Sequence, residues 1–363
     1  MDRKQLLRDV LAGHRLTEGE ALSLMSVKDR GVFDICSAAD EIREVRAGDI
    51  VTYVRNQNIH VSNICKNLCG FCGFGRRAGD EGAFLDDEET VRRKARLAAE
   101  RQVTEICLLS GVHPDFTLDS YLDILRWTAE EAPGVHIHAF SPDEVAHASA
   151  RSGVSTVEVL EQMKEAGMFS LQGTAAEILV DEVRAVICPR KIDTATWVRI
   201  IQQAHGAGIP TTATIMYGSY EGERERIRHL SILRDIQDRT GGFTEMIPLT
   251  YIHTNTPLYR QGIARPGATG REDLLMIAIS RLFLDNFRNI QVSWGKLGTK
   301  LSQLALLSGA NDLAGTMFSD DVSADAGAAD AEFLDPEIMK RITADIKRPL
   351  CQRYTDYSLV STG

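Results

Sequence analysis

Short apolar runs alternate with amphipathic stretches along most of this 363-residue chain, and this alternation constrains the fold more than any other feature. Apolar residues at helical spacing follow each short run, which indicates a series of strand–helix repeats. Such repeats are typical of a parallel sheet covered by helices. The predicted strands are residues 59–63, 105–110, 135–140, 168–171, 211–216, 244–250 and 290–294, with a short eighth one within 309–315.

The number and length of these repeats favour a closed ring of strands. Seven or eight strand–helix units in about 260 residues match the size of a (β/α)8 barrel. We therefore expect an α/β fold of the (β/α)8 TIM type, with a doubly wound open sheet as the alternative. The predicted helices are residues 87–101, 120–132, 142–152, 156–166, 175–185, 194–207, 224–239, 271–287 and 296–308.

The two ends of the chain follow other patterns. Apolar residues recur at helical spacing around Leu6 and Val10, and Thr17-x-x-Glu20 is typical of a helix-capping box. The acidic stretch 319–332 has little periodicity and predicts a loop. We expect a helical N-terminal extension over residues 1–50, the barrel over 51–318, and a C-terminal loop, helix and tail that close the barrel over 319–363.

Composition excludes several classes of protein. With 41 Lys and Arg against 51 Asp and Glu, the formal net charge is −10, so the chain lacks the basic surface that nucleic acid binding requires. No apolar run reaches the roughly 18 residues of a membrane span, and the N-terminal residues lack the apolar core of a signal peptide. We expect no nucleic acid partner, no membrane association and a cytoplasmic location, where an odd number of cysteines favours metal or redox chemistry over disulfides. The seven cysteines are Cys36, Cys65, Cys69, Cys72, Cys107, Cys188 and Cys351.

Three of these cysteines, Cys65, Cys69 and Cys72, directly follow the first predicted strand. At spacings of four and three residues, their thiolates can converge from one loop onto a metal centre. A structural zinc site closes with four protein ligands and a [4Fe–4S] cluster usually takes four thiolates, so three ligands leave one position open. A zinc knuckle or a closed structural cluster remains the alternative. The candidates for a distant fourth ligand are Cys107, Cys188 and Cys351.

The CxxxCxxC pattern, with the aromatic Phe71 before its last cysteine, resembles the radical S-adenosylmethionine (SAM) superfamily. The resemblance implies a [4Fe–4S] cluster on Cys65, Cys69 and Cys72, with Phe71 beside the cofactors and SAM chelated to the fourth iron. One-electron reduction would then split SAM into methionine and a 5′-deoxyadenosyl radical. The position of the loop agrees, because catalytic groups of such barrels lie at the C-terminal ends of the strands.

The loops after the next three strands carry the residues that this resemblance assigns to SAM. Ser110-Gly111 stands where superfamily members commonly have a Gly-Gly turn for the SAM amino group, and it keeps one permissive glycine. Ser141 follows the third strand and also fits a helix N-cap. By resemblance Glu177 binds the SAM ribose and Arg184 the SAM carboxylate. Seven residues apart, the two would share one face of a helix.

Several longer stretches resemble the CofH family, the 4-hydroxyphenyl transferases of FO synthase, which help to make the deazaflavin of coenzyme F-420. The resemblance extends from about residue 16 to 360 and implies a radical SAM transferase. Such an enzyme breaks the Cα–Cβ bond of L-tyrosine and couples the 4-hydroxybenzyl unit to 5-amino-6-(D-ribitylamino)uracil. It also implies a CofG partner enzyme and an electron donor such as ferredoxin or flavodoxin. The stretches that carry it are 177–184, 187–192, 208–218, 240–245, 255–259, 289–294 and 309–313.

Polar residues near the predicted strand ends are the candidates for substrate contact, because neutral polar groups and histidines can hydrogen-bond a uracil and ribityl hydroxyls. We expect Tyr217, His253, Asn255 and Asp312 to be catalytic. The further candidates are His60, His113, His138, Tyr251, Ser293 and Lys296.

Departures from the CofH pattern keep other readings open. They are Ser219, Gly295 and the segment 319–321, and they bear on the substrate pair more than on the radical chemistry. The enzymatic alternatives are a CofH-like paralogue with a changed substrate and an aminofutalosine-synthase-like (MqnE) enzyme of the menaquinone pathway. A ferredoxin-like electron carrier or zinc module is the alternative outside enzymes, although a carrier needs neither an open iron nor a large cavity.

Overall fold

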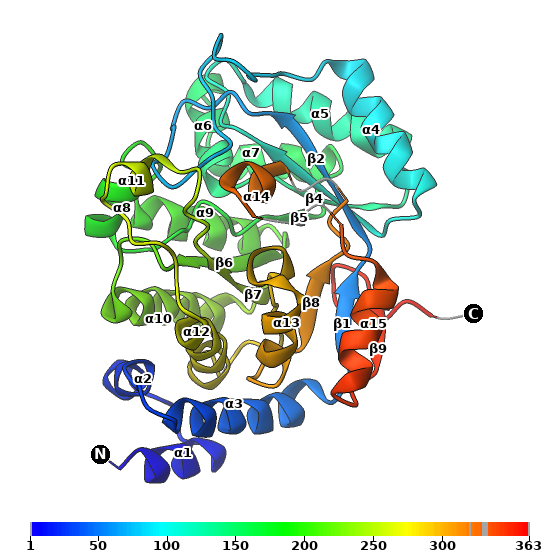
Figure 1. Cartoon of the computed structure of the whole chain (residues 1–363). Helices are drawn as coiled ribbons and strands as arrows, with labels where there is room; N and C mark the ends of the chain where they lie inside the picture. The colour runs from blue at the N-terminus through cyan, green and yellow to red at the C-terminus, as the bar shows by residue number, and fades with distance from the viewer. Residues whose placement is uncertain (1, 319–320, 329–332, 362–363) are drawn as a thin grey trace.

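Parallel strands alternate with helices in the computed structural model, which describes residues 2–318, 321–328 and 333–361 (Figure 1). The strands are β1 (Val51–Val54), β2 (Asn56–Ser62), β3 (Glu105–Ser110), β4 (His136–Ala139), β5 (Ser170–Leu171), β6 (Thr211–Tyr217), β7 (Phe243–Thr250), β8 (Asp312–Gly315) and β9 (Leu350–Arg353). The helices are α1 (Arg3–Leu11), α2 (Glu18–Met25), α3 (Gly31–Ala47), α4 (Glu88–Glu100), α5 (Leu118–Glu131), α6 (Pro142–Ser152), α7 (Thr156–Glu165), α8 (Asp181–Ile187), α9 (Thr194–Gly206), α10 (Glu223–Thr240), α11 (Pro257–Arg260), α12 (Gly270–Phe283), α13 (Trp294–Leu306), α14 (Asp321–Ala326) and α15 (Pro336–Asp345). The predicted α/β class is confirmed.

Within the described residues the strands pair in two parallel sheets rather than one continuous ladder. One sheet has the order β2-β3-β4-β5-β6-β7 and the other the order β8-β1-β9. Single parallel bridges link them, because Met246 of β7 pairs with Ile290 and Gln291 pairs with Asp312 of β8. After one intervening residue β1 continues into β2, so the pairings pass round a (β/α)8 TIM-type arrangement. The predicted seventh strand is thereby reduced to two bridging residues.

Local sequence signals explain where the best-predicted helix begins and ends. Ser141 caps α6, accepting a hydrogen bond from the Glu144 backbone while the Glu144 carboxylate accepts one from the Ser141 backbone. Gly153 ends the helix in the left-handed region at a φ of 71°. These are the capping box and glycine stop that the sequence predicts, and the helix matches its predicted range 142–152.

The helix predicted over 175–185 is wrong in its first half, because α8 begins only at Asp181. Ala175 and Glu177 take positive φ values of 63° and 44°, which an α-helix does not allow. The chain therefore loops before α8, and Glu177 and Arg184 do not share a helix face.

The C-terminal part also differs from expectation in one place. The predicted loop 319–332 contains the short helix α14, while residues 319–320 and 329–332 lie outside the described residues. The tail follows the prediction, since α15 is succeeded by the extended strand β9. β9 pairs in parallel with β1, from Val51↔Leu350 to Val54↔Arg353. The tail thus joins the N-terminal end of the barrel.

The N-terminal helices α2 and α3 pack beneath the barrel helices α10 and α12, and α1 packs against α3 (Figure 1). Thr17 and Glu20 form the predicted capping box at the start of α2. The Arg234 guanidinium of α10 donates to the Leu16 carbonyl oxygen at 2.8 Å, which ties this extension to the barrel.

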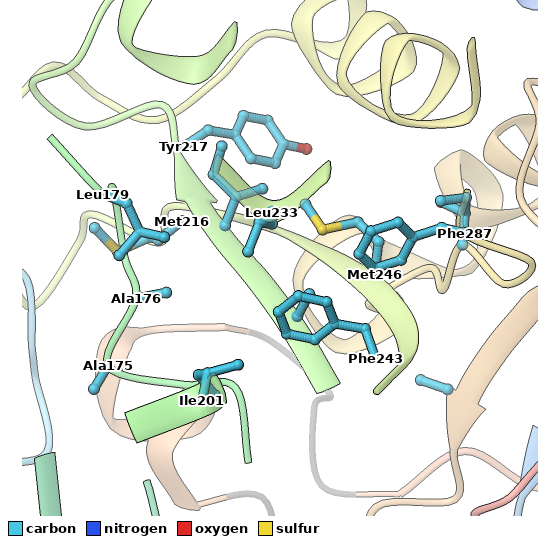
Figure 2. Close-up of a cluster of buried hydrophobic side chains, with 14 of the residues drawn as sticks. Ala175, Ala176, Leu179, Ile201, Met216, Tyr217, Leu233, Phe243, Met246 and Phe287 are labelled. Carbon is cyan, nitrogen blue, oxygen red and sulfur yellow. The ribbon is translucent and has the colours of Figure 1, made fainter. Parts of the chain in front are cut away.

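The strands present different residues to the helices and to the barrel interior. On β2, Ile59 and Val61 belong to the apolar core, whereas Asn58 and His60 alternate with them on the other face. Figure 2 shows the apolar layer beside β6 and β7, where Leu233, Phe243 and Met246 lie within one cluster. The interior is therefore polar, and the layer between strands and helices is apolar.

Across residues 2–318, 321–328 and 333–361, no helix combines the length and apolarity needed to cross a membrane.

Candidate active site

The three-cysteine loop follows β2 and lies at the C-terminal ends of the barrel strands. Cys69 is buried, and Cys65 and Cys72 are partly exposed. The Cys65 backbone donates to the Arg76 carbonyl at 2.9 Å, and the Cys72 backbone donates to the Cys69 carbonyl at 3.0 Å. The Gly75 backbone donates to Cys72 Sγ at 3.4 Å. The loop is thus folded by its own backbone and offers one N–H group to a thiol.

The thiols need a positive partner in order to ionise. Burial raises the pKa of Cys69 well above its ordinary value and also raises that of Cys72, so a nearby cation or metal has to stabilise these thiolates. In the part of the chain that the structure describes, no three His, Cys, Asp or Glu side chains come close enough to hold one metal ion. A four-iron cluster offers each thiolate its own iron, so its ligands stand further apart. Three free thiols on one loop are the ligand type that such a cluster takes.

The remaining cysteines lie elsewhere, and all seven are free thiols. Cys107 is in the barrel interior, where its thiol donates to Glu105 at 3.2 Å. Cys351 lies on β9 at the N-terminal end. Only Cys188, at the end of α8, acts electrostatically on the pKa of Cys69.

Three neighbouring elements hold the loop at its glycines. The Gly70 backbone donates to the Ile187 carbonyl of α8 at 2.9 Å, and the Leu258 backbone of α11 donates to the Gly70 carbonyl at 2.8 Å. A Cβ atom at Gly73 would lie 2.8 Å from the carbonyl oxygen of Asp325 in α14. The cysteine loop is therefore enclosed by α8, α11 and α14 (Figure 1), and only glycine permits the approach of α14.

Ser110 and Gly111 end β3 directly against the cysteine loop. The Gly111 backbone donates to the Ser62 carbonyl at 2.7 Å, and Ser110 Oγ donates to the Gly111 carbonyl at the same distance. A Cβ atom at Gly111 would lie 2.5 Å from the Ile64 carbonyl oxygen and 3.0 Å from Cys65 Cβ. Glycine is required here for close packing, and the structure brings this predicted turn next to a predicted cluster ligand.

Arg184 departs from its expected role. Its five N–H groups donate to backbone carbonyls, and the guanidinium is buried within the loop before α8. This arrangement contradicts the expected contact with the SAM carboxylate, because no N–H is left for a ligand. The reason is the left-handed bend in the chain, which turns the carbonyls toward the guanidinium. These carbonyls belong to Ala175, Ala176, Ile178 and Ile192.

A half-buried lysine, Lys191, lies beside the cysteine loop instead, although sequence reasoning gave it no role. Lys191 Nζ lies 2.8 Å from the Glu177 carboxylate and 5.9 Å from the centre of the half-buried Phe71 ring. Burial lowers the pKa of Lys191, but the charges of Glu177 and Cys69 outweigh it and raise the pKa well above its ordinary value. A charged ammonium is thus held next to a predicted cluster ligand. Only its position within the 187–192 stretch pointed to it.

Ser141 serves as a helix cap, and its partner is unusual. Its Oγ donates to Glu144 Oε2 at 2.8 Å. Burial raises the pKa of Glu144 to about 8, and among the described residues Glu144 Oε1 has no hydrogen-bond partner. The adjoining Asp143 accepts from the Asn67 side chain, which links α6 to the cysteine loop. Sequence reasoning missed Asn67 and Asp143, although both stand within its motifs.

Tyr217 lies on the opposite face from the barrel interior. It shares a face of β6 with Ala213 and Ile215, which are fully buried, and its hydroxyl donates to Asp273 Oδ1 of α12 at 2.7 Å. The Arg226 guanidinium of α10 lies 5.3 Å from its ring centre. The side chain therefore packs in the helix layer of Figure 2, which contradicts the expected position at the substrate.

The prediction that Asp312 lies near the C-terminal end of a strand is also wrong, because Asp312 is the first residue of β8. It lies at the N-terminal end of the barrel, where Arg353 Nε donates to its carboxylate at 2.5 Å and Thr52 Oγ1 donates at 2.6 Å. Arg353 also reaches Glu245 at 3.4 Å. Thr355 donates to Glu105 at 2.7 Å, so the tail supplies the partners of the buried carboxylates.

The candidates after β7 do lie at the C-terminal end. His253 is half-buried with its ring 4.4 Å from that of Tyr259, and the Asn255 side chain donates to the Asp325 carbonyl of α14 at 3.1 Å. Tyr251 bonds to the Thr256 hydroxyl. These contacts place the segment after β7 against α14.

Other candidates have contacts of several kinds. His60 and Ser293 are buried, the His113 ring accepts from the Asp115 backbone at 3.2 Å, and Lys296 donates to Ser323 of α14 at 2.6 Å. His138 bonds to Ser170 in the interior. The departure at Ser219 lies in a turn in which the Glu221 carboxylate accepts from its hydroxyl at 3.0 Å.

Comparison with known proteins resolves the family. Residues 59–233 match the model of the radical SAM superfamily, and residues 240–359 match the CofH/MqnC C-terminal region. A protein from Methanoculleus marisnigri named 5-amino-6-(D-ribitylamino)uracil–L-tyrosine 4-hydroxyphenyl transferase is 60% identical over 98% of this chain and 97% of its own length. The chain belongs to this radical SAM transferase family. Proteins of the same name from Methanosphaerula palustris and Methanothermobacter thermautotrophicus are 58% and 46% identical, over 99% and 94% of this chain and 98% and 94% of their own lengths.

Solved structures of distant members share the fold. Methylornithine synthase (PylB) has a TM-score of 0.73 at 19% identity, over 95% of this chain and 97% of its own. The FeFe-hydrogenase maturase HydG from Carboxydothermus hydrogenoformans has a TM-score of 0.74 at 15% identity, over 97% of this chain and 79% of its own. The radical SAM fold is therefore shared despite low sequence identity.

Proposed function

We propose that this chain transfers the 4-hydroxybenzyl unit of L-tyrosine to 5-amino-6-(D-ribitylamino)uracil in FO biosynthesis. The observation that carries the proposal is full-length similarity, at up to 60% identity, to transferases of that name. The position of the cysteine loop supports it, because barrel enzymes bind substrates at the C-terminal ends of their strands.

Cys65, Cys69 and Cys72 would hold a [4Fe–4S] cluster, and SAM would bind beside it. The cluster would supply the electron that splits SAM into methionine and a 5′-deoxyadenosyl radical. The Gly111 backbone lets the β3 turn approach the cluster position, and the Gly75 N–H stabilises the negative charge on Cys72 Sγ.

The SAM-binding groups differ in part from those of the sequence-based expectation. Glu177 is the group proposed to accept hydrogen bonds from the ribose. It forms an ion pair with Lys191, which in turn lies near the Phe71 ring. Lys191, rather than Arg184, is the charged group next to Cys69 that can face the anionic end of SAM. A lysine can do this as a point charge without the paired geometry of an arginine.

Substrate contacts are proposed at two levels of the barrel. His253 and Asn255 lie at the C-terminal end, in contact with Tyr259 and α14. His60 and His138 lie in the polar interior. These groups can orient a polar substrate, while α14 and the loops around it exclude water from reactive intermediates.

Anaerobic reconstitution with iron and sulfide, followed by incubation with SAM, dithionite, L-tyrosine and the aminouracil, tests the proposal. We expect 5′-deoxyadenosine, methionine and a product that joins the hydroxybenzyl and uracil units. An adenosine-containing adduct would instead indicate chemistry of the aminofutalosine-synthase type. Absence of SAM cleavage with every substrate tried would refute radical SAM activity, as expected for a carrier or zinc module.

The proposal includes a cytoplasmic site of action and two protein partners. A ferredoxin or flavodoxin would supply the electron, and a CofG enzyme would close the ring of the product. Replacing dithionite by a reduced ferredoxin in the same assay tests the first of these, and adding a CofG enzyme and measuring FO tests the second.

A further inference from the structure

Two histidines and a serine form a continuous hydrogen-bonded chain near the N-terminal end of the barrel. Ser170 of β5 lies opposite His138 of β4 in the parallel ladder. Its Oγ is 2.7 Å from His138 Nδ1 and 2.7 Å from His136 Nε2. One hydroxyl therefore joins two imidazole rings on the same face of β4.

The hydrogen bonds of this His–Ser–His chain have a fixed direction from donor to acceptor. A serine hydroxyl has a single proton to donate, so with two ring nitrogens as partners it accepts from one and donates to the other. Of the two ring nitrogens that face Ser170, one therefore carries a proton and the other does not. Such an ordered chain can pass a proton from one ring to the other.

The two ends of the chain have different surroundings. His138 is 8% exposed, and within the described residues its Nε2 makes no hydrogen bond. His136 is half-buried, and its ring lies 5.3 Å from that of Phe169, which is 56% exposed. One end of the chain thus opens to the interior and the other reaches toward solvent.

We propose that His138, Ser170 and His136 form a relay that carries a proton from the barrel interior to solvent during the coupling step. This inference rests on the proposed function, because that reaction releases a proton inside the barrel. His138 is the residue that accepts the proton. Ser170 and His136 hold His138 in position and carry the proton away from it.

The step balances as a proton loss coupled to a one-electron oxidation. Addition of a benzyl radical to the uracil double bond leaves an adduct with one unpaired electron. To become a closed-shell product, the adduct has to lose one electron, which the oxidised iron–sulfur cluster would accept when bound, and it gives an N–H proton to His138 Nε2. His138 Nδ1–H then protonates Ser170 Oγ as its own proton passes to His136 Nε2, and His136 releases a proton from Nδ1 to water.

Burial favours the neutral form of both rings, which suits this role. Burial lowers the pKa of His138 to about 4, against the opposing charge of Glu105, while His136 and Arg353 lower it further. Burial also lowers the pKa of His136, against Glu105 and Asp356. Neutral imidazoles accept at one nitrogen and donate at the other, so both rings are ready to relay at neutral pH.

An isosteric pair of variants tests the relay in the reconstituted enzyme. Ser170→Thr and Ser170→Val add the same bulk at position 170, but only threonine keeps a hydroxyl. With Ser170→Val we expect coupled product to fall at least about tenfold while 5′-deoxyadenosine continues to form, and with Ser170→Thr we expect most of the coupling to be retained. Equal coupling in the two variants would overturn the relay.

His136 and His205 provide a matched comparison. His205 also bridges two hydroxyls, of Thr240 at 2.7 Å and Thr211 at 2.9 Å, but it lies on α9 outside the barrel interior. We expect His136→Ala to lose coupling and to regain it when imidazole is added, and His205→Gln to keep the wild-type ratio of product to 5′-deoxyadenosine. Loss of coupling in His205→Gln, or no response of His136→Ala to imidazole, would contradict the proposal.

A measurement on the protein without cofactors separates the relay from the proposed function. Long-range ¹H–¹⁵N spectra of the histidine rings report which nitrogen carries the proton. We expect one of the pair His138 Nδ1 and His136 Nε2 to be protonated and the other not, and Ser170→Val to abolish this complementarity. Protons on both of these nitrogens, or on neither, would overturn the relay whatever reaction the enzyme catalyses.

Discussion

At the C-terminal end of the barrel, three thiols lie on one short loop, and the loop is held by backbone contacts at glycines. At the N-terminal end, Glu105, Glu245 and Asp312 come from three strands, and the tail that carries Arg353 supplies their partners. The first end is left with groups that an external ligand can use. The second has its buried carboxylates neutralised from within the chain, so we call the first the functional end and the second the closed end, where the proposed relay through His136 leads to solvent.

The largest effect should come from removing a thiol at the functional end. Cys69→Ala is expected to abolish the iron–sulfur chromophore and all SAM cleavage, because two thiolates cannot hold the cluster in place. Iron and sulfide analysis after reconstitution, with a 5′-deoxyadenosine assay, measures both. Cys351→Ala, at the closed end, serves as the control and should keep both properties. A colourless, inactive Cys351→Ala protein would refute three-ligand binding.

Removing the cation at the closed end should instead cost stability. Arg353→Met leaves Asp312 and Glu245 buried without their guanidinium partner, for which we expect a loss of about 3–5 kcal/mol in the free energy of unfolding. Urea denaturation of the variant and of Lys340→Met, an exposed change on α15, gives the comparison. A variant no less stable than Lys340→Met would show that the tail does not stabilise this end.

A smaller loss of stability is expected at the turn after β3, where a substitution should affect both the fold and cluster binding. The Cβ atom of Gly111→Ala would contact Ile64 and Cys65, which should destabilise the fold by about 1–3 kcal/mol and lower cluster occupancy. Gly206→Ala in α9 is the matched control, since no atom lies within 4 Å of its added Cβ. Iron content and denaturation should be unchanged or slightly improved in that control. Full iron content in Gly111→Ala would contradict the close packing of the turn against Cys65.

The last effect is spread over several pH units. Burial raises the pKa of Glu144 to about 8, from an ordinary value of 4.5, so the folded state keeps a proton that the unfolded chain loses. Stability should therefore fall as pH rises from about 4.5 to 8, by at most about 1.4 kcal/mol per pH unit from this group. Glu144→Gln should flatten denaturation measured across that range, and the exposed change Glu337→Gln should not. The slope left in Glu144→Gln combines Glu245 at the closed end, whose pKa burial raises to about 7, with buried histidines such as His138, whose lowered pKa acts in the opposite direction. An unchanged slope in Glu144→Gln would show that Glu144 is ionised in the folded protein.

Local patterns were sufficient to predict the fold class and to place three cysteines on one loop. The strand–helix alternation predicted the fold class, and the spacing of Cys65, Cys69 and Cys72 predicted one loop, because neighbouring residues fold together. Strand alternation explains the error at Tyr217, whose side chain shares a face with Ala213 and Ile215. That alternation is visible in the sequence, but which face lies inside depends on the partner helices.

Contacts between distant segments could not be predicted. The Arg184 guanidinium donates all its hydrogen bonds to backbone carbonyls because the chain bends at Ala175 and Glu177. These non-glycine residues adopt positive φ values that no sequence rule indicates. Asp312 resembled a substrate ligand because its partner Arg353 stands 41 positions further along the chain. Long-range charge pairing is invisible to patterns that extend over a few turns of helix.

The dependence of the closed end on Arg353 has a consequence for how the protein is made. While the chain emerges from the ribosome, Glu105, Glu245 and Asp312 are synthesised well before the arginine that neutralises Asp312 and Glu245. Burying unpaired carboxylates is unfavourable, so the nascent barrel should stay open at this end until residue 353 has left the exit tunnel. The order of synthesis thus delays the final closure of the barrel and leaves its interior accessible to chaperones until then.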